Sequence, residues 1–493
     1  MSESEYEVRC AKRDAWIADD VDPYPPRSER THSCEEARNC FSDETTKAVS
    51  VTVAGRVRAI RGHGKTMFLT IEDASGRIQL NFRFDILGES YRIWKKRLDV
   101  GDFIETTGEL FRTKTGEITV LAREVRLLCK SLEPLPAKWH GLSDVEIRFR
   151  RRYLDLLANR QVKEIFEIRA RVIKTIRKFL DDRGFVEVET PMMQTLAGGA
   201  AARPFRTHHN TLDIDLFLRI APELYLKRLL VGGFERVYEL NRNFRNEGMD
   251  RNHNPEFTML EVYEAYGDYE TMMNLTEELI AFVVREIHGR ETLPEQEGRP
   301  ANVAPPWPRV PFLKAIRDGG GPDLDPADLD SVRKSAEERA LECDLADPAA
   351  CFDAFFDRYA EPYLVGPVFI TDFPLVMSPL AKSRPGSPGI VERFEVFIGG
   401  MEIANAFTEL NDPREQERRF LEQAQAKGTP GEIDWDYIRA LRVGMPPAGG
   451  LGIGIDRLVM LVTGTRTIRD VILFPTMRPV QEDLRSEKDE VGE

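Results

Sequence analysis

The stretch FERVYELNRNFRNEGMDRNHNPEFTMLEVYE, residues 234–264, contains two runs of strand-forming residues separated by a polar loop. Side chains two positions apart point to the same side of a β-strand. The second run therefore places Phe257, Met259, Glu261 and Tyr263 on one face. A strand face that mixes a carboxylate with aromatic rings is poor core material, so this stretch is a candidate binding site.

The first run and the loop bring further charged residues into the same region. The first run is read as an outgoing strand on which Arg245 and Glu247 share a face, and residues 248–255 are read as a loop rich in turn-forming and phosphate-contacting side chains. Spacing alone leaves two interpretations open, a solvated face with ordinary ion pairs and a ligand site. For a hairpin picked at random the solvated face is the commoner outcome.

Three separate runs resemble one enzyme family. The run RNEGMDRNHNPEF, residues 245–257, closely resembles motif 2 of class II aminoacyl-tRNA synthetases, and specifically that of the lysine enzymes. GFVEVETPMM, residues 184–193, is similar to motif 1, and GLGIGIDRLVM, residues 450–460, to motif 3. The likeness extends over residues 50–479, with the motifs in the family's order and spacing.

The resemblance implies an α+β fold in which an N-terminal OB-fold β-barrel precedes a class II synthetase catalytic domain, an antiparallel β-sheet flanked by helices. The expected segments are a helical and irregular N-terminal extension (1–49), an OB-fold anticodon-binding domain (50–130), a linker (131–150), the catalytic domain (151–480) with a helical insertion at about 266–378, and an acidic tail (481–493).

Composition is typical of a globular protein of two or three domains. Of 493 residues, 31% are charged and 42% hydrophobic, and no apolar run approaches the roughly 18 residues of a membrane helix. The N-terminus lacks the pattern of a secretory signal. Six scattered cysteines without a paired CxxC are expected to be free thiols. These features predict a cytoplasmic protein with no membrane partner.

Short β-rich runs between residues 50 and 130 predict a five-stranded barrel of the OB type, which binds oligonucleotides. The whole chain has a formal charge of −14, but basic residues outnumber acidic ones in this region. A β-module that only spaces domains is the alternative, and the local positive charge favours nucleic acid. Residues 59–66, AIRGHGKT, fit a loose phosphate-loop pattern, yet a strand-like run follows them, so we expect a hairpin.

The barrel is similar to the anticodon-binding domain of lysyl-tRNA synthetases, which implies tRNA(Lys) as the partner. By position, Phe68 is expected to stack on an anticodon base, with Arg61, Gln79 and Glu117 reading base edges. Each is equally compatible with an ordinary residue on the surface of a barrel.

A helix predicted over residues 162–180 carries a stripe of isoleucine and valine and leads into motif 1. In the family this helix and the strand after it form the dimer interface. By sequence alone they are equally compatible with an internal core. The resemblance favours a homodimer.

The resemblance implies ATP as a substrate and Arg245 and Arg457 as the catalytic residues. Arg245 is expected to neutralise the α-phosphate and the substrate carboxylate, and adenine to lie between Phe257 and Arg457. Glu247 is expected to hold the adenine amine, and His253 to contact the distal phosphates. Glu395 belongs to the same ATP site.

Two features qualify the nucleotide site. Some family members place arginine directly before the histidine of motif 2, whereas this chain has Asn252 before His253 and arginine at position 251. The resemblance also makes Glu395 and Glu402 ligands of Mg²⁺, an ion that binds carboxylate oxygens and bridges ATP phosphates.

Residues 392–409 alternate in the manner of a strand. Glu402 has the opposite parity to the polar residues further along, so it reaches their site only if the strand bends, and the expected position of the bend is near Gly399 and Gly400. The residues expected on the site face are Asn405, Phe407 and Glu409.

In the family, the small-residue run near Gly199 closes over the amino acid, and Glu223 takes the α-ammonium. A pocket that contains Glu261 and Glu409, with Tyr263 nearby, suits a cationic side chain and repels aspartate. The lysine-binding residues implied are Gly199, Glu223, Glu261, Tyr263, Asn405, Phe407 and Glu409.

The expected reaction is therefore the ATP-dependent ligation of L-lysine to tRNA(Lys) through lysyl-adenylate. Three alternatives remain at this point. A protein-lysylating relative shares the catalytic core but lacks the barrel. An aspartyl or asparaginyl enzyme shares barrel and core but should not have two acids in its side-chain pocket. A non-catalytic tRNA-binding derivative should have lost some of the charged residues named above.

Overall fold

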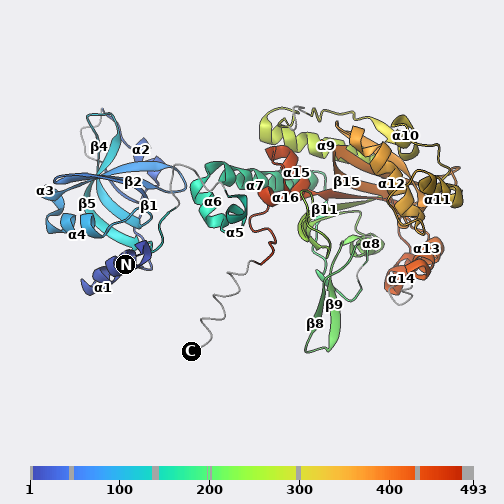
Figure 1. Cartoon of the computed structure of the whole chain (residues 1–493), viewed down its shortest axis with the longest axis horizontal. Coiled ribbons are helices and arrows are strands. Elements are labelled where there is room, and N and C mark those ends of the chain that lie inside the picture. Colours follow the sequence, from blue (N-terminus) through green and yellow to red (C-terminus); the bar gives the residue numbers. More distant parts are fainter. Residues whose placement is uncertain are drawn as a thin grey trace. The chain divides into compact units, whose positions relative to one another are not determined.

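The structure is a computed structural model of the full chain, and its parts fall into two compact units, Met1–Ser143 and Asp144–Glu493 (Figure 1). The residues that the structure describes are 4–43, 49–135, 144–196, 198–199, 202–295, 301–427 and 433–479. The acidic tail expected at 481–493 and residues 136–143 of the expected linker lie outside them. None of the helices in these ranges is long and apolar enough to span a membrane.

The first unit contains a closed five-stranded barrel, which confirms the predicted OB fold. Its strands, in the barrel order β1-β2-β3-β5-β4, are β1 (Ser50–His63), β2 (Thr66–Glu72), β3 (Arg77–Arg83), β4 (Phe103–Arg112) and β5 (Ile118–Cys129). Alternate residues such as Met67, Leu69 and Ile71 fill the barrel interior. His63 pairs with Thr66 across a tight turn, so the hairpin expected at residues 59–66 is confirmed.

Four short helices complete this unit: α1 (Glu5–Ala18), α2 (Cys34–Asn39), α3 (Phe84–Leu87) and α4 (Glu89–Arg97). Trp16 of α1 packs on Trp94 of α4 with the ring centroids 4.8 Å apart, and α2 is buried in the same core. The extension expected to be helical and irregular at 1–49 thus holds a second helix, at residues 34–39. Ser33 and Glu36 form a reciprocal capping box that begins α2.

The second unit is built on an eight-stranded sheet, which confirms the predicted α+β class. Its six central strands are antiparallel, and an edge strand pairs in parallel at each side. In sheet order the strands are β12 (Arg309–Pro311), β13 (Val368–Pro374), β14 (Ile390–Ile398), β15 (Met401–Thr408), β16 (Ala448–Gly454), β11 (Glu256–Ala265), β10 (Arg236–Phe244) and β6 (Val186–Glu187).

Three helices pack against this sheet in one hydrophobic core: α7 (Arg160–Asp181), α9 (Tyr269–His288) and α15 (Ile455–Thr463). On α7, Val172 and Ile176 are fully buried, and Ile165, Ile168 and Ile173 pack beside them. The predicted apolar stripe of this helix therefore contributes to the internal core.

The remaining elements lie around the sheet (Figure 1). They are α5 (Val145–Arg150), α6 (Arg152–Ala158), β7 (Met193–Gln194), β8 (Arg206–His209), β9 (Ile214–Leu218), α8 (Glu223–Val231), α10 (Phe312–Asp318), α11 (Leu329–Glu338), α12 (Pro348–Tyr359), the 3₁₀ turns Glu361–Tyr363 and Leu375–Met377, α13 (Pro413–Lys427), α14 (Trp435–Val443) and α16 (Ile468–Val471). Strands β7, β9 and β8 form a separate three-stranded sheet.

Two segments differ from the sequence interpretation. Residues 266–378, expected to be a helical insertion, do hold several helices but also supply β12 and β13 to the main sheet. Phe369 and Ile370 of β13 are fully buried, so this segment is part of the core. Residues 145–150, expected in the linker, form helix α5.

One carboxylate of motif 3 connects helix α7, which leads into motif 1, with strand β11, in which motif 2 ends. Asp456, in the first turn of α15, accepts a hydrogen bond from the Arg169 guanidinium of α7 at 2.5 Å. Its other oxygen accepts from the Thr258 amide of β11 at 2.6 Å, and Arg169 also donates to the Thr258 hydroxyl. Asp456 is 2% exposed. This junction fixes the position of Arg457, the next residue along the helix.

Candidate active site

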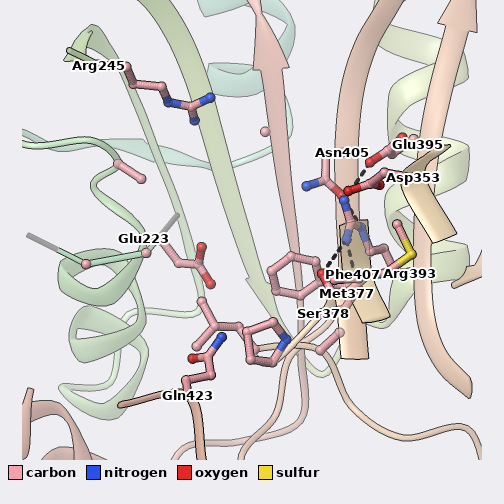
Figure 2. Close-up of a pocket in the computed structure, with 18 of the residues that line it drawn as sticks. Glu223, Arg245, Asp353, Met377, Ser378, Arg393, Glu395, Asn405, Phe407 and Gln423 are labelled. Atoms are coloured by element: carbon pink, nitrogen blue, oxygen red, sulfur yellow. Dashed lines mark hydrogen bonds and ion pairs between the residues drawn. The ribbon is translucent and has the colours of Figure 1, made fainter. Parts of the chain in front are cut away.

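A cavity of about 1540 Å³ opens over β11, β15 and β16. Figure 2 shows Glu223 and Arg245 on one side of it, and Asn405, Phe407 and Glu395 on the other. The predicted site residues that line it are Gly199, Glu223, Arg245, Glu247, His253, Phe257, Glu261, Tyr263, Glu395, Glu402, Asn405, Phe407 and Arg457. Glu409 is fully buried and lies outside this lining.

The face predicted for β11 is confirmed. Phe257, Met259, Glu261 and Tyr263 all line the cavity, while the residues between Met259 and Tyr263 with the opposite parity belong to the hydrophobic core. The Tyr263 hydroxyl donates to the Glu261 carboxylate at 3.1 Å. Strict alternation holds here because β11 pairs without interruption on both sides.

The position expected for Arg245 on a strand is wrong. Strand β10 ends at Phe244, and the Arg245 amide donates to the carbonyl of Pro255 at 2.8 Å, which closes the loop. The Arg245 guanidinium lies 5.1 Å from the centroid of the Phe257 ring, within cation–π range. Its Nε has no hydrogen-bond partner among the described residues. Glu247 is exposed in the same loop.

Arg457 bonds to residues of the loop and of β15. It donates to the Glu402 carbonyl at 2.7 Å and to the Glu402 carboxylate at 3.2 Å. It also donates to Nε2 of His253 at 2.8 Å, and Nδ1 of that ring is 2.7 Å from Asp250. Because arginine only donates, His253 carries its proton on Nδ1. The guanidinium within cation–π distance of the Phe257 ring is that of Arg245, rather than that of Arg457.

Strand β15 contains the bend that Glu402 requires, but at a different place from the one expected. Glu395 pairs with Asn405, whereas Phe397 pairs with Glu402, so Ile403 is an extra residue, a β-bulge. The bulge turns Glu402 to the same face as Glu395 and Asn405. Gly399 and its neighbour form the hairpin turn instead, both with positive φ.

Arg393 lies in the wall of the cavity beside Glu395 and Asn405. Its guanidinium donates to the Asn405 side-chain oxygen at 3.0 Å, to the Glu395 carboxylate at 2.5 Å and to the Ser378 hydroxyl at 2.8 Å, as Figure 2 shows. Burial, with the charge of Glu402, raises the pKa of Glu395 to about 7, although Arg393 opposes the rise. Two carboxylates of this kind on one face suit a divalent cation.

Acidic side chains gather beside and beneath the cavity where α8 meets the sheet. Glu223, at the start of α8, and Glu409, just after β15, both contact the ammonium of Lys227. Nζ of Lys227 lies 2.6 Å from Glu223 and 5.2 Å from the centroid of the Phe407 ring. Burial alone lowers the pKa of Lys227, but Glu223 and Glu409 raise it above its ordinary value, so the ammonium stays charged.

Two glycines shape this pocket. A Cβ at Gly450 would overlap the Glu409 carboxylate and approach the Tyr263 ring to 2.6 Å. Gly199 has a φ of +88°, and a Cβ there would lie 3.1 Å from the Cβ of Glu223. The pocket therefore depends on close backbone approach at both positions.

Glu261 is a buried acid that forms no ion pair with a basic side chain among the described residues. It is 4% exposed, and burial together with the charge of Glu223 raises its pKa to about 8. The side chain is therefore mostly protonated at pH 7, and a bound cation would displace that proton.

We expect Glu261→Gln to stabilise the ligand-free protein increasingly as pH rises. An acid whose pKa is about 8 in the folded chain and roughly 4.3 in the unfolded chain lowers the free energy of unfolding progressively as pH rises between those two values. Above the higher value the free energy of unfolding falls no further. Between pH 6 and pH 8 the free energy of unfolding of the variant should rise by about 2 kcal/mol relative to that of the parent. The measurement is thermal unfolding at each pH. Glu291→Gln, at a partly exposed position where the carboxylate pairs with Arg285, serves as control. A gain that does not change with pH contradicts the assignment.

The residues predicted on the barrel share its outer surface. Arg61 pairs with Phe68 across the β1–β2 ladder, and Gln79 of β3 pairs with Thr70, two residues beyond Phe68. Thr119 of β5 donates to the Gln79 side chain at 2.8 Å. Glu117 lies just before β5 and is exposed.

The sequence interpretation missed two residues that line the cavity, Arg393 and Asp353, and one buried beneath it, Lys227. Lys227 lies four positions after Glu223, a spacing that brings two side chains together on a helix and was available as a signal. Arg393 lies two positions before Glu395 and shares its strand face. Asp353, on α12, points toward Arg393 and Glu395 in Figure 2, and no local pattern marks it.

Comparisons with known proteins cover nearly the whole chain. Residues 144–478 match the family model described as class II tRNA synthetases (D, K and N), and residues 51–128 match that of the OB-fold nucleic acid binding domain. The chain is 53% identical to the lysine–tRNA ligase of Carboxydothermus hydrogenoformans, over 93% of this chain and 95% of that one. The lysine–tRNA ligase of Pelotomaculum thermopropionicum is also 53% identical, over 93% and 92%. That of Syntrophomonas wolfei is 51% identical, over 97% and 99%.

Proposed function

The chain belongs to the class II tRNA synthetases (D, K and N), its activity is that of an ATP-dependent lysine–tRNA ligase, and we propose here which residues carry that activity. Its partners are L-lysine, ATP and tRNA. The observation on which the assignment rests is the acidic pocket of Glu223, Glu261 and Glu409 beside the guanidinium of Arg245.

The reaction has two steps. The lysine carboxylate attacks the α-phosphorus of ATP to give lysyl-adenylate and pyrophosphate, and the lysyl group then passes to the 3′-hydroxyl of the terminal adenosine of the tRNA. Neither step needs a nucleophile from the enzyme. Catalysis therefore depends on positioning and on stabilisation of negative charge.

The amino-acid subsite recognises two ammonium groups. Glu223, with Gly199 close to it, receives the α-ammonium. The side-chain ammonium is received by Glu261 and Glu409, with the hydroxyl of Tyr263 alongside. Asn405 and Phe407 form the wall of this subsite. One ammonium, that of Lys227, pairs with two of these acids, so an acidic substrate side chain adds a further negative charge to a buried acidic pocket, which is the basis of selection against aspartate.

The nucleotide subsite is formed from the loop after β10 and from motif 3. Arg245 neutralises the α-phosphate and the substrate carboxylate, while Arg457 approaches the phosphates and the base. Phe257 supplies an aromatic surface for adenine. Contacts of Glu247 with the adenine amine and of His253 with the distal phosphates complete the proposal for ATP.

Glu395 and Glu402 are the residues that fit Mg²⁺. They lie on one face of the β14–β15 hairpin because of the bulge at Ile403, and the charge of Glu402 contributes to the raised pKa of Glu395. Magnesium usually binds through one or two carboxylates together with substrate phosphates. When bound, the ion would neutralise part of the negative charge on the phosphate oxygens.

The barrel is proposed to read the anticodon of tRNA(Lys) through Phe68, Arg61, Gln79 and Glu117. Base stacking on an exposed aromatic ring contributes about 1–3 kcal/mol per base. We expect Phe68→Ala to raise the KM for tRNA in lysylation roughly tenfold without changing lysine-dependent pyrophosphate exchange. Tyr6→Ala, an exposed aromatic residue of α1, is the control. A parallel loss in both assays contradicts the role of Phe68.

We further propose that the enzyme is a homodimer that works in the cytoplasm, where its tRNA is used. Edge strand β6 presents Val186, which is 46% exposed, and Met193 of motif 1 is 56% exposed. Exposed apolar residues at a sheet edge are suited to a second copy of the chain.

Pyrophosphate exchange from ATP, with each proteinogenic amino acid in turn, tests the substrate assignment. Lysine alone should support rapid exchange. Exchange with aspartate or asparagine would contradict the assignment of the acidic pocket. Lysylation of tRNA, compared with lysylation of protein substrates, separates the proposed acceptor from the protein-lysylating alternative.

A further inference from the structure

The ammonium of Lys227 lies between two carboxylates that come from different elements. Glu223 precedes it by one helical turn on α8, and Glu409 follows β15. Nζ lies 2.6 Å from Glu223 Oε1 and forms an ion pair with Glu409 Oε2. The Lys227 side chain is 0% exposed, so this bridge is sealed beneath the cavity.

These partners are the same residues that the proposed function assigns to the substrate. Glu223 is the proposed receptor of the α-ammonium, and Glu409 is a proposed receptor of the side-chain ammonium. Glu409 Oε1 also has no hydrogen-bond partner among the described residues. The side chain of Lys227 therefore links the two ends of the subsite and leaves one oxygen of Glu409 unpaired.

The ionisable groups around Lys227 indicate the role of its ion pairs with Glu223 and Glu409, which together form the bridge. The ionisable groups that face it are Glu223 on α8, Glu261 and Tyr263 on β11, Glu409 after β15, and Tyr437 on α14. Without Lys227, the side chains of Glu223 and Glu409 would have no cation between them in a buried site. With Lys227 in place, its ammonium pairs with both and holds them at a fixed separation.

We infer that Lys227 is a specificity-determining positioning residue, whose ammonium fixes the distance between the α-ammonium and side-chain ammonium receptors. The inference rests on the proposed function. It has two consequences: lysine binding depends on Lys227 although ATP binding does not, and the enzyme distinguishes lysine from its shorter homologue ornithine through the same bridge.

The test is Lys227→Met in the full chain, which keeps the length of the side chain and removes its charge. In pyrophosphate exchange we expect the KM for lysine to rise at least about 20-fold, with the KM for ATP changed less than about twofold. The lysine-to-ornithine ratio of kcat/KM should fall about tenfold or more, since a missing methylene is normally worth about 10–200-fold.

Lys314→Met is the matched control, because Lys314 forms an i,i+4 ion pair with Asp318 on the exposed surface of α10. It should leave both substrates unaffected. A lysine KM and a lysine-to-ornithine ratio that stay within twofold of the parent in folded Lys227→Met would overturn the inference, as would tighter lysine binding.

A double-mutant cycle with Glu409→Gln separates positioning from a general structural role. If Lys227 acts through Glu409, adding Lys227→Met to Glu409→Gln should weaken lysine binding by no more than about fivefold further. A fully additive loss overturns the inference. Lys227→Gln takes the place of Lys227→Met in the cycle if the latter fails to fold. A parent enzyme that shows no lysine-dependent exchange would instead contradict the proposed function itself.

Discussion

Replacing Arg245 with alanine is expected to lower lysine-dependent pyrophosphate exchange about 10³-fold, mainly through kcat. Negative charge develops on the α-phosphate as the lysine carboxylate attacks it, and a preorganised donor in a water-poor site stabilises that charge strongly. Arg245 is suited to this task because it lines the cavity, lies over the Phe257 ring at 5.1 Å and has an unpaired Nε among the described residues.

Two further variants test whether the effect of Arg245→Ala is specific to this site. Arg285→Ala removes an exposed guanidinium that pairs with Glu291 on the surface, and it should leave exchange unchanged. Arg245→Lys keeps the charge but loses the planar guanidinium, so it should recover only part of the rate. A loss of less than about tenfold in Arg245→Ala would show that charge stabilisation at the α-phosphate resides elsewhere.

Glu409→Gln is expected to weaken lysine binding by about 2–5 kcal/mol, the cost of removing one member of a buried charge pair. Glu409 is fully buried, pairs with Lys227, and its second oxygen lies against Gly450. The neutral amide cannot balance both the ammonium of Lys227 and that of the substrate. The KM for lysine in pyrophosphate exchange should rise at least about 30-fold, while the KM for ATP stays near that of the parent.

The control for this variant is Glu291→Gln, the same chemical change in a partly exposed ion pair with Arg285, away from the cavity lining. Lysine titration of the purified variant by calorimetry gives the affinity without the chemical step. An unchanged lysine affinity in Glu409→Gln would remove this residue from the pocket and leave Glu261 as the acid that selects the side chain.

Much of the fold was predictable because it follows from regular elements and from a close resemblance. The face of β11 was predicted correctly, since an uninterrupted strand keeps a period of two. The five-stranded barrel followed from short β-rich runs with turn residues between them. The hairpin at residues 59–66 followed from the strand-like run after it.

The errors occur where backbone geometry departs from a regular pattern. Nothing local showed that β10 ends at Phe244, because the end depends on a hydrogen bond to Pro255 across the loop. A glycine pair is the ordinary signal for a bend, so the bulge at Ile403 was placed too early in the sequence. Asp353 reaches the cavity only through the packing of α12, which no short-range pattern encodes.

The bulge at Ile403 has a consequence for how the two substrates are held together. In the proposed assignment, the strand contributes Glu402 to the ATP subsite upstream of the inserted residue and Asn405 to the lysine subsite downstream of it. One continuous backbone thus carries two half-sites that are out of phase by a single position. In this assignment, the number of residues at the bulge sets how the lysine carboxylate is aligned with the α-phosphorus of ATP. A one-residue deletion there would shift the ATP subsite and the lysine subsite relative to each other, although the remaining residues of each subsite would be unchanged.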